Sequence, residues 1–302
     1  MSDPLSNLSA ELAATVERVS QNAVAVVGGA RFGASGFFLR ENVVVTSAHA
    51  LRGAEELQVT LPDGERKPGK LAGSDPGTDV AVLRVEASAT LRIEAAEPSE
   101  ARPGALALAV GRSPDVGTLA AFGVVSAVSR GWRTWRGGWI DRYTRLDLRL
   151  YPGLAGAAVV DVGGKLLGLA SPALSRLAPL AVPLETIERV AAELLEAGHV
   201  RRGYLGIGLQ PVALPAVHSE SLGRQRALLV VSIEPGQPAD SAGFLIGDIL
   251  LAIDGKRADD TDDVQATLGG DSIGRPLDAE ILRGGEPRRL TVTPRERPSG
   301  GD

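Results

Sequence analysis

Between residues 22 and 182 the chain consists of short apolar runs separated by glycine, proline and aspartate. The clearest runs are residues 24–27, 36–39, 43–45, 57–61, 80–83, 106–110 and 122–125. Short runs at near-regular spacing predict many short β-strands that pack as barrels or sandwiches, rather than as βαβ units. Because about 160 residues of such strands exceed what one small barrel uses, we expect more than one barrel.

Helical periodicity flanks this strand-rich segment on both sides. Residues 4–19 carry apolar side chains at steps of three and four, which predicts an amphipathic helix. A second stripe of this kind begins at Pro183, a residue favoured in the first turn of a helix, and stops at Gly198. From about residue 203, strand and short helix patterns alternate, which indicates a separate module.

The sequence therefore divides into four segments. We expect an N-terminal amphipathic helix in residues 1–21 and a mainly β domain in 22–200 that closes with a helix over 183–197. An α+β domain follows in 201–296, and a tail in 297–302. A length of 302 residues is sufficient for two or three domains with cores of their own.

Composition excludes several classes of chemistry. The chain has no cysteine, so disulfides, thiol nucleophiles and cysteine-based zinc sites are excluded, and its three histidines lack the spacing of a metal site. The sequence contains no phosphate-binding loop, so we expect neither a metal nor another cofactor. A formal net charge of −5 predicts no bulk attraction to nucleic acid.

The N-terminus and the hydropathy bear on localisation. The chain does not open with a basic region followed by an apolar run, and no stretch approaches the roughly 20 apolar residues that span a bilayer. As it stands, the sequence predicts a cytoplasmic protein without a membrane span. If a leading signal or anchor has been removed, a periplasmic or membrane-anchored protein is predicted instead.

Three segments together have the pattern of a serine-protease active site without its serine. His49 and Asp79 precede the loop 151–158 in the order His, Asp, nucleophile, which is the order of chymotrypsin-type triads. Taken singly, each is more often a packed histidine or a turn acid, so the combination carries the hypothesis. At the nucleophile position stands Ala155, which has no hydroxyl and cannot form an acyl-enzyme.

The same loop predicts an oxyanion hole. Gly153 can adopt a backbone shape that exposes its N–H group, and an alanine side chain leaves the N–H of Ala155 intact. We therefore expect the amides of Gly153 and Ala155 to face the oxyanion that develops during acyl transfer.

These segments resemble the HtrA family of trypsin-like serine proteases, in which a double β-barrel protease precedes a PDZ domain. The likeness runs from about residue 12 to 295, and the segments that carry it best are residues 35–39, 45–49, 79–85, 119–130 and 146–156. It implies a mainly β fold, with a chymotrypsin-like double β-barrel in 22–200 and a C-terminal α+β PDZ domain in 201–296. It also implies an endopeptidase of protein quality control that cleaves unfolded polypeptides, with apolar residues preferred at the cut.

The departures from the family pattern lie in the nucleophile loop. The family has Asn-Ser-Gly-Gly-Pro where this chain has Leu-Ala-Gly-Ala-Ala over 154–158. In one interpretation the serine of an active endopeptidase was replaced deliberately; retention of both His49 and Asp79 favours it. In the other the chain is a natural pseudoprotease that acts as a peptide-binding scaffold or chaperone. The further changes at Leu154, Ala157 and Ala158 favour that interpretation.

The second module has a signature of its own. Residues 203–207 resemble the carboxylate-binding loop of PDZ domains, in which backbone N–H groups capture a peptide C-terminus and the peptide adds as a strand beside a helix. The residues expected to bind peptide are Tyr204, Leu205, Gly206, Ile207, Val264 and Leu268. Val264 would equally suit the domain core.

All three tryptophans, Trp132, Trp135 and Trp139, lie among six arginines in residues 130–149. One interpretation is a loop whose rings pack on the barrel. The resemblance implies another, a sensor loop that couples PDZ occupancy to the active site. Stacking on nucleic-acid bases or contact with a membrane face is a third, which the acidic chain disfavours.

The resemblance also bears on assembly, because family members often form trimers through their N-terminal segments. The apolar face of helix 4–19 could serve a homo-trimer, or it could pack on its own barrel.

Overall fold

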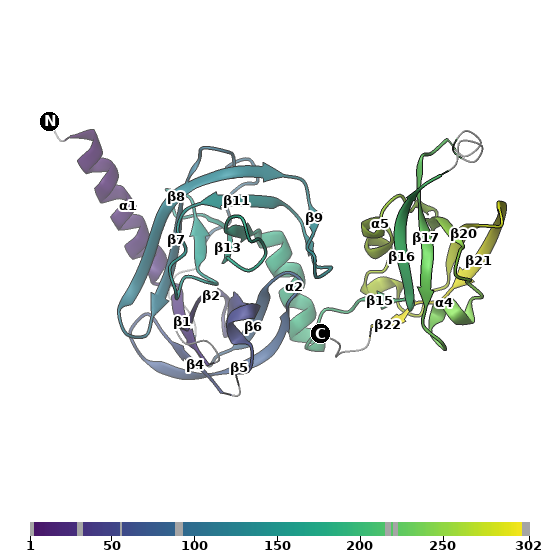
Figure 1. Cartoon of the computed structure of the whole chain (residues 1–302). Helices are drawn as coiled ribbons and strands as arrows, with labels where there is room; N and C mark the ends of the chain where they lie inside the picture. Colours follow the sequence, from purple (N-terminus) through teal and green to yellow (C-terminus); the bar gives the residue numbers. More distant parts are fainter. Residues whose placement is uncertain are drawn as a thin grey trace. The chain divides into compact units, whose positions relative to one another are not determined.

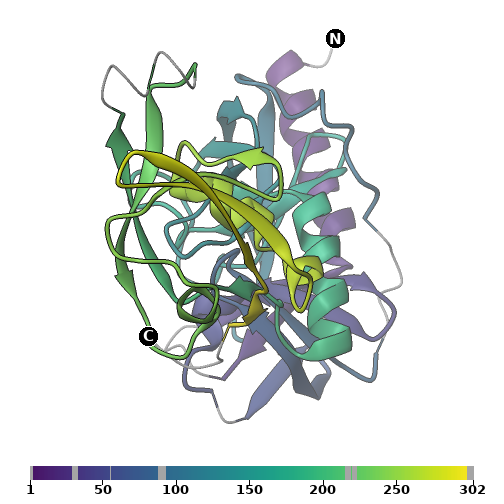
Figure 2. The same cartoon turned by 90° about the vertical axis from the view of Figure 1, so that its right-hand side faces the viewer.

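The computed structural model describes residues 3–28, 33–54, 56–87, 93–214, 219 and 223–297. The chain divides into two units, Met1–Val200 and Arg201–Asp302. Figures 1 and 2 show both units, coloured from purple at the N-terminus to yellow at the C-terminus. Each unit has its own hydrophobic core and is described by itself.

Six strands close into the first barrel in the order β1-β2-β3-β6-β5-β4. They are β1 (Ala23–Val27), β2 (Ala34–Arg40), β3 (Val43–Ser47), β4 (Leu57–Thr60), β5 (Arg66–Asp75) and β6 (Val80–Arg84). Their inner side chains form an apolar cluster that includes Val24, Phe38, Val44 and Leu83. Closure leaves none of the six strands with an unpaired edge, which is how a barrel satisfies its backbone hydrogen bonds.

The second barrel closes in the order β11-β14-β13-β12-β7-β8. Its strands are β7 (Leu106–Ser113), β8 (Gly117–Ser129), β11 (Tyr143–Asp147), β12 (Ala158–Val160), β13 (Leu166–Ser171) and β14 (Leu180–Val182). A small hairpin of β9 (Trp132–Arg133) and β10 (Trp139–Ile140) lies between β8 and β11 in the chain. Leu146 and Val159 are fully buried in the cluster inside this barrel.

Two helices complete the first unit. Helix α1 (Pro4–Ser20) begins at an Asp3 cap, and α2 (Leu184–Ala197) ends at Gly198 with a left-handed φ of 80°. The stripe predicted to start at Pro183 begins one residue later, because Pro183 has an extended ψ of 158° and serves as the N-cap. A third apolar cluster joins the barrels and both helices, with Val19, Phe37, Leu108 and Ile187 among its buried members.

The second unit is a twisted sheet with short helices. Its main strands follow the order β16-β17-β18-β20-β21, so β16 and β21 are the edges. The bounds are β16 (Ile207–Ala213), β17 (Arg226–Ile233), β18 (Ile249–Ile253), β19 (Lys256–Arg257), β20 (Leu277–Arg283) and β21 (Glu286–Val292). The remaining elements are β15 (Gly203–Tyr204), β22 (Arg295–Glu296), α4 (Pro238–Ser241), α5 (Thr261–Thr267) and the 3₁₀ turn η2 (Gly270–Ser272).

This architecture confirms the predicted fold class, a mainly β chain with two barrels followed by an α+β domain. Within the described ranges, no helix has the length and apolar character needed to span a bilayer.

One buried ion pair holds the sheet of the second unit to the turn before β18. The side chain of Asp248 is 1% exposed and accepts two hydrogen bonds of 2.7 Å from Arg283, as well as one of 2.8 Å from the N–H of Leu245. Burial alone would raise the pKa of Asp248, but the hydrogen bonds from Arg283 and Leu245 leave this pKa below its usual value. The carboxylate is therefore more stable ionised in the folded state than in the unfolded chain.

We expect Asp248→Ala to lower the free energy of unfolding of this unit by about 3 kcal/mol, because it leaves the Arg283 guanidinium without its carboxylate partner. The matched control is Glu280→Ala, which removes the acid of an exposed pair with Arg289 and should cost under about 1 kcal/mol. Since folding lowers the pKa of Asp248, its contribution is complete above about pH 4 and is lost as the pH falls further. Urea unfolding at several pH values measures this, and equal losses for both variants would contradict it.

Candidate functional site

His49 and Asp79 lie at adjoining ends of two paired strands. β3 and β6 run antiparallel with Ser47 opposite Val80, so the residues that follow β3 and precede β6 meet at one end of the first barrel. His49 lies in the 3₁₀ turn η1 (Ala48–Leu51), and its Nδ1 is 3.0 Å from both carboxylate oxygens of Asp79. The His49 main-chain N–H donates to Oδ1 of Asp79 at 2.9 Å.

The Asp79 carboxylate has partners from both barrels. The residue is only 2% exposed, and its Oδ2 accepts hydrogen bonds from the hydroxyls of Ser47 at 2.7 Å and Ser171 at 2.5 Å. Burial raises the pKa of this carboxyl, but the hydrogen bonds and charge of His49, with the Ser171 bond, bring the pKa below its usual value. Asp79 is therefore ionised at neutral pH and able to orient a neighbouring imidazole.

The two serines beside Asp79 were not singled out in the sequence. Ser47 stands two residues before His49, so its proximity to the histidine is a local signal that could have identified it. Ser171 ends β13 in the second barrel, 92 residues from Asp79 in the chain. No local pattern relates these two positions, and only the packing of the barrels brings them together.

The loop around Ala155 is fixed by main-chain hydrogen bonds to both barrels. The N–H of Ser35 donates to the carbonyl of Ala155 at 2.9 Å, and the N–H of Gly156 donates to the carbonyl of Ala170 at 2.8 Å. A Cβ placed on Gly156 would lie 2.8 Å from the main-chain N of Ser47, so this loop passes directly beside the segment that carries His49.

The amides predicted to form the oxyanion hole have no acceptor among the described residues. Gly153 has a left-handed φ of 94°, and neither its N–H nor that of Ala155 donates a hydrogen bond to any residue that the structure describes. The intervening Leu154 donates to the carbonyl of Tyr151 at 3.0 Å. Two unpaired donors on one tight turn suit an anionic oxygen.

The three tryptophans have three different environments. The Trp132 ring packs edge-on against Tyr143 with centroids 5.6 Å apart, whereas Trp135 is 74% exposed and lies under the guanidinium of Arg136. The indole N–H of Trp139 donates to Asp141 at 3.0 Å. The loop that carries them also contacts the turn that precedes Asp79. The hydroxyl of Thr134 donates to the carbonyl of Gly77 in this turn at 2.7 Å.

In the second unit, the carbonyl groups of the turn between β15 and β16 are hydrogen-bonded to other parts of the domain. The carbonyls of Leu205 and Gly206 each accept a hydrogen bond of 2.8 Å, from the N–H groups of Ala239 and Glu234. Gly206 has a left-handed φ of 69°, and the N–H groups of Leu205 and Gly206 donate to no described residue. The hydroxyl of Tyr204 bonds Glu234, which raises the pKa of the tyrosine.

The other residues predicted for peptide binding lie beside this turn. Ile207 begins the edge strand β16, and α5 contacts that strand (Figure 1). Val264 is 3% exposed in the core of the unit, with Ile207 and Leu268 packed partly buried against the same cluster. Val264 is therefore a core residue, and Ile207 and Leu268 offer partly exposed apolar surface.

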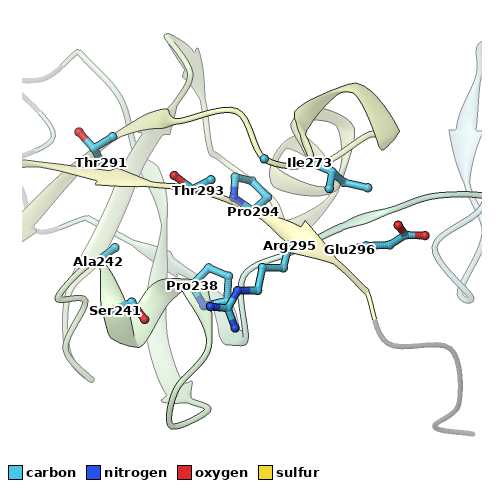
Figure 3. A pocket seen from close by; sticks show the side chains of 10 residues that line it. Pro238, Ser241, Ala242, Ile273, Thr291, Thr293, Pro294, Arg295 and Glu296 are labelled. Carbon is cyan, nitrogen blue, oxygen red and sulfur yellow. The ribbon is translucent and has the colours of Figure 1, made fainter.

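Two features outside these sites are also defined. Within the described ranges, His, Cys, Asp and Glu side chains form no group of three or more that could hold a metal ion. A hollow of about 510 Å³ lies in the second unit, between α4 and the strands β21 and β22. Figure 3 shows the side chains that line it. It is lined by Pro238, Ser241, Ala242, Ile273, Gly274, Thr291, Thr293, Pro294, Arg295 and Glu296, none of which is predicted to bind peptide.

Comparison with known families agrees with this layout. Residues 34–169 match the trypsin-like peptidase domain, and residues 203–293 match the PDZ domain. The chain is thus a trypsin-like peptidase domain followed by one PDZ domain.

The names of individual relatives identify a narrower class of peptidase, the serine endoproteases. The chain is 29% identical to the "Probable periplasmic serine endoprotease DegP-like" of Halomonas elongata and 28% identical to the periplasmic pH-dependent serine endoprotease DegQ of Escherichia coli strain K12, over 86% and 83% of its length. It spans 55% and 56% of those two proteins. A solved serine-to-alanine form of the HtrA-type protease AlgW with a decapeptide superimposes with a TM-score of 0.80 at 26% identity, covering 95% of this chain and 98% of that one.

The homologues of this chain are thus DegP-like and HtrA-type serine endoproteases.

We expect Gly156→Ala to destabilise the first unit, because its Cβ would overlap the carbonyl oxygen of Ser35. The matched control is Gly64→Ala, at a similar positive φ of 87° with no atom within 4 Å of the added Cβ. Both variants carry the strain of a left-handed alanine, so the difference, about 1–3 kcal/mol in unfolding free energy, isolates the crowding. Urea unfolding followed by tryptophan fluorescence measures it; equal losses would mean that the loop is not held against β2 and β3.

Proposed function

We propose that this chain is an HtrA-type serine endopeptidase that cleaves unfolded polypeptides after apolar residues, in a form made inactive by alanine at position 155. The observation that carries the proposal is the pairing of His49 with Asp79, next to a loop whose Gly153 and Ala155 amides have no acceptor among the described residues. A buried, ionised carboxylate that holds a histidine by its Nδ1 is the arrangement that prepares an imidazole to take a proton from a nucleophile. The single missing group is the hydroxyl.

With serine at position 155, each remaining residue has a defined role. His49 takes the hydroxyl proton as the oxygen attacks a peptide carbonyl, and later returns a proton to the leaving amine. Asp79 holds the imidazole through Nδ1 and stabilises its protonated form. The main-chain N–H groups at positions 153 and 155 would bind the oxyanion, and neither depends on which side chain stands at position 155.

Substrate preference is inferred from the strands next to the nucleophile loop. Residues of β13 and β14 are buried and carry no charged side chain. A pocket walled by these strands would favour small or medium apolar side chains over lysine or arginine.

The alternative function is a natural pseudoprotease that binds peptides as a scaffold or chaperone. Its support lies in the neighbours of Ala155. Leu154 is 1% exposed, and Ala157 and Ala158 are fully buried, so the residues that depart from the family pattern are packed into the apolar core. A core adapted to these side chains is compatible with a loop that has long lacked a nucleophile.

The second unit is proposed to bind the C-termini of protein chains. The unpaired N–H groups of Leu205 and Gly206 would hold a terminal carboxylate, and the peptide would pair with the edge strand β16. Ile207 and Leu268 would contact its last side chain. The tryptophan loop is proposed to sense this binding, because Thr134 links that loop to the turn that carries Asp79.

Assembly and location are further parts of the proposal. Leu5 and Leu8 at the start of α1 are 73% and 38% exposed, which would suit packing between copies in a homo-trimer. The names of the relatives DegP-like and DegQ place those proteins in the periplasm, and we propose the same compartment for this chain.

Restoring the hydroxyl tests the enzyme proposal. We expect Ala155→Ser to be labelled at position 155 by a fluorophosphonate and to degrade an unfolded protein substrate, as followed by mass spectrometry and gel electrophoresis. Adding His49→Ala to this variant should lower kcat by roughly 10⁶ and abolish the labelling. A folded Ala155→Ser protein that is neither labelled nor active would favour the scaffold.

A second test addresses peptide capture. A peptide with a free apolar C-terminus should bind the chain at least about tenfold more tightly than the same peptide with a C-terminal amide, because the amide removes the charge that the loop would hold. Fluorescence polarisation measures both affinities. Leu268→Glu should weaken binding of the free peptide, whereas Leu245→Glu, at an exposed leucine outside the proposed site, should not. Equal affinities for the two peptides would contradict carboxylate recognition.

A further inference from the structure

One buried serine, Ser35, makes hydrogen bonds to three other parts of the first unit. Its hydroxyl donates to the carbonyl of Gly153 at 2.6 Å and accepts from the N–H of Arg112 at 3.0 Å. Its N–H donates to the carbonyl of Ala155, and its own carbonyl accepts from the hydroxyl of Thr46 at 2.6 Å. The residue is completely buried, so each of these bonds forms without competition from water.

The two carbonyls that accept hydrogen bonds from Ser35 belong to Gly153 and Ala155, the residues whose amides are expected to form the oxyanion hole. Gly153 and Ala155 both point a carbonyl at Ser35, and both keep an N–H group without an acceptor among the described residues. Glycine at a φ of 94° has several accessible backbone states, so this peptide can rotate unless something restrains it. The bonds from Ser35 supply that restraint on both sides of Leu154.

The space around the Ser35 hydroxyl is shaped for it. A Cβ on Gly111, the neighbour of Arg112 in β7, would overlap the Ser35 hydroxyl oxygen, so no larger residue fits at that position beside it. Close approach of this kind is a physical reason for glycine inside a strand.

Behind Ser35, the side chain of Arg112 reaches the end of α1. Its guanidinium donates to the carbonyl of Ala23 at 2.9 Å and to the carbonyl of Ser20, the last residue of α1, at 3.2 Å. Arg112 is 9% exposed, and burial lowers the pKa of its guanidinium. A buried guanidinium must keep its hydrogen-bond acceptors, so the position of Arg112 depends on the carbonyls of Ala23 and of Ser20 at the end of α1.

We propose that Ser35 is a positioning residue for the oxyanion loop and that Arg112 couples it to the end of the N-terminal helix. The path runs from Ser20 through Arg112 and Ser35 to Gly153 and Ala155, and every step is a direct hydrogen bond. The catalytic meaning of this coupling rests on the proposed function, in which the amides of those two residues bind the oxyanion. The positioning itself is a property of the chain with alanine at position 155.

Hydrogen exchange in the protein as it stands tests the positioning without any need for activity. The amides of Leu154, Gly156 and Ala157 are hydrogen-bonded and report on the loop. In Ser35→Ala we expect them to exchange at least about tenfold faster, while strands of both barrels stay protected. The matched control is Ser126→Ala, which removes a hydroxyl whose two hydrogen bonds in the described part of the chain are both with Arg145 in β11, outside the loop.

Arg112→Met tests the coupling to α1. It should speed exchange both at the last turn of α1 and at the amides of Leu154, Gly156 and Ala157. If only the helix responds, the coupling is overturned. If Ser35→Ala is folded and its loop amides exchange as in the parent protein, the positioning role is overturned. Should Ser35→Ala fail to fold, Ser35→Cys keeps a similar shape with a weaker donor, and an intermediate rate is expected.

The Ala155→Ser background separates this inference from the proposed function. There we expect Ser35→Ala to lower kcat by about 10²–10³ with KM changed less than about threefold, because the oxyanion is bound only in the transition state. An equal loss from Ser126→Ala, or a loss confined to KM, would overturn the positioning role. If Ala155→Ser itself is inactive, the proposed function fails, and the exchange rates still decide the role of Ser35.

Discussion

The burial of one carboxylate, that of Asp79, is the constraint on which the first unit depends. An ionised carboxylate inside a protein must be hydrogen-bonded or paired, and Asp79 is 2% exposed. Its partners are Ser47 at the end of β3, His49 just after β3, and Ser171 at the end of β13. Because these belong to different barrels, the carboxylate is fully satisfied only when both barrels have formed and packed together. The site is therefore complete only in a unit whose two barrels are both folded.

The nucleophile loop is held by a different set of contacts. Its bonds to Ser35 and Ala170 involve the main chain of residues 153, 155 and 156, so they do not depend on the side chain at position 155. This explains how a complete frame exists around an alanine. It also means that the geometry of the frame is compatible with either origin of the alanine, and only chemistry at a restored hydroxyl separates them.

Several features could be predicted from local pattern because their causes are local. Short apolar runs predicted the strands, and the stripe before Gly198 predicted α2, which ends there in a left-handed turn. Other positions stayed ambiguous because side-chain type does not specify packing. Val264 suited both core and peptide contact and is 3% exposed, and of the tryptophans Trp132 packs on Tyr143 while Trp135 is exposed. The contacts of Ser35 and Ser171 could not be predicted from local pattern, since serine is common and their partners are distant in the chain.

By itself, the sequence determined that this chain has strand-rich and α+β modules, and that a histidine and an acid precede a glycine-framed loop whose nucleophile position is alanine. Those properties lie in residue type, order and short-range spacing. Only the tertiary structure decided which hydroxyls satisfy Asp79, which amides remain unpaired, and that Arg112 joins the end of α1 to Ser35. Such contacts link segments far apart in the chain, and they form because two closed barrels bury polar groups that must find partners at their junction.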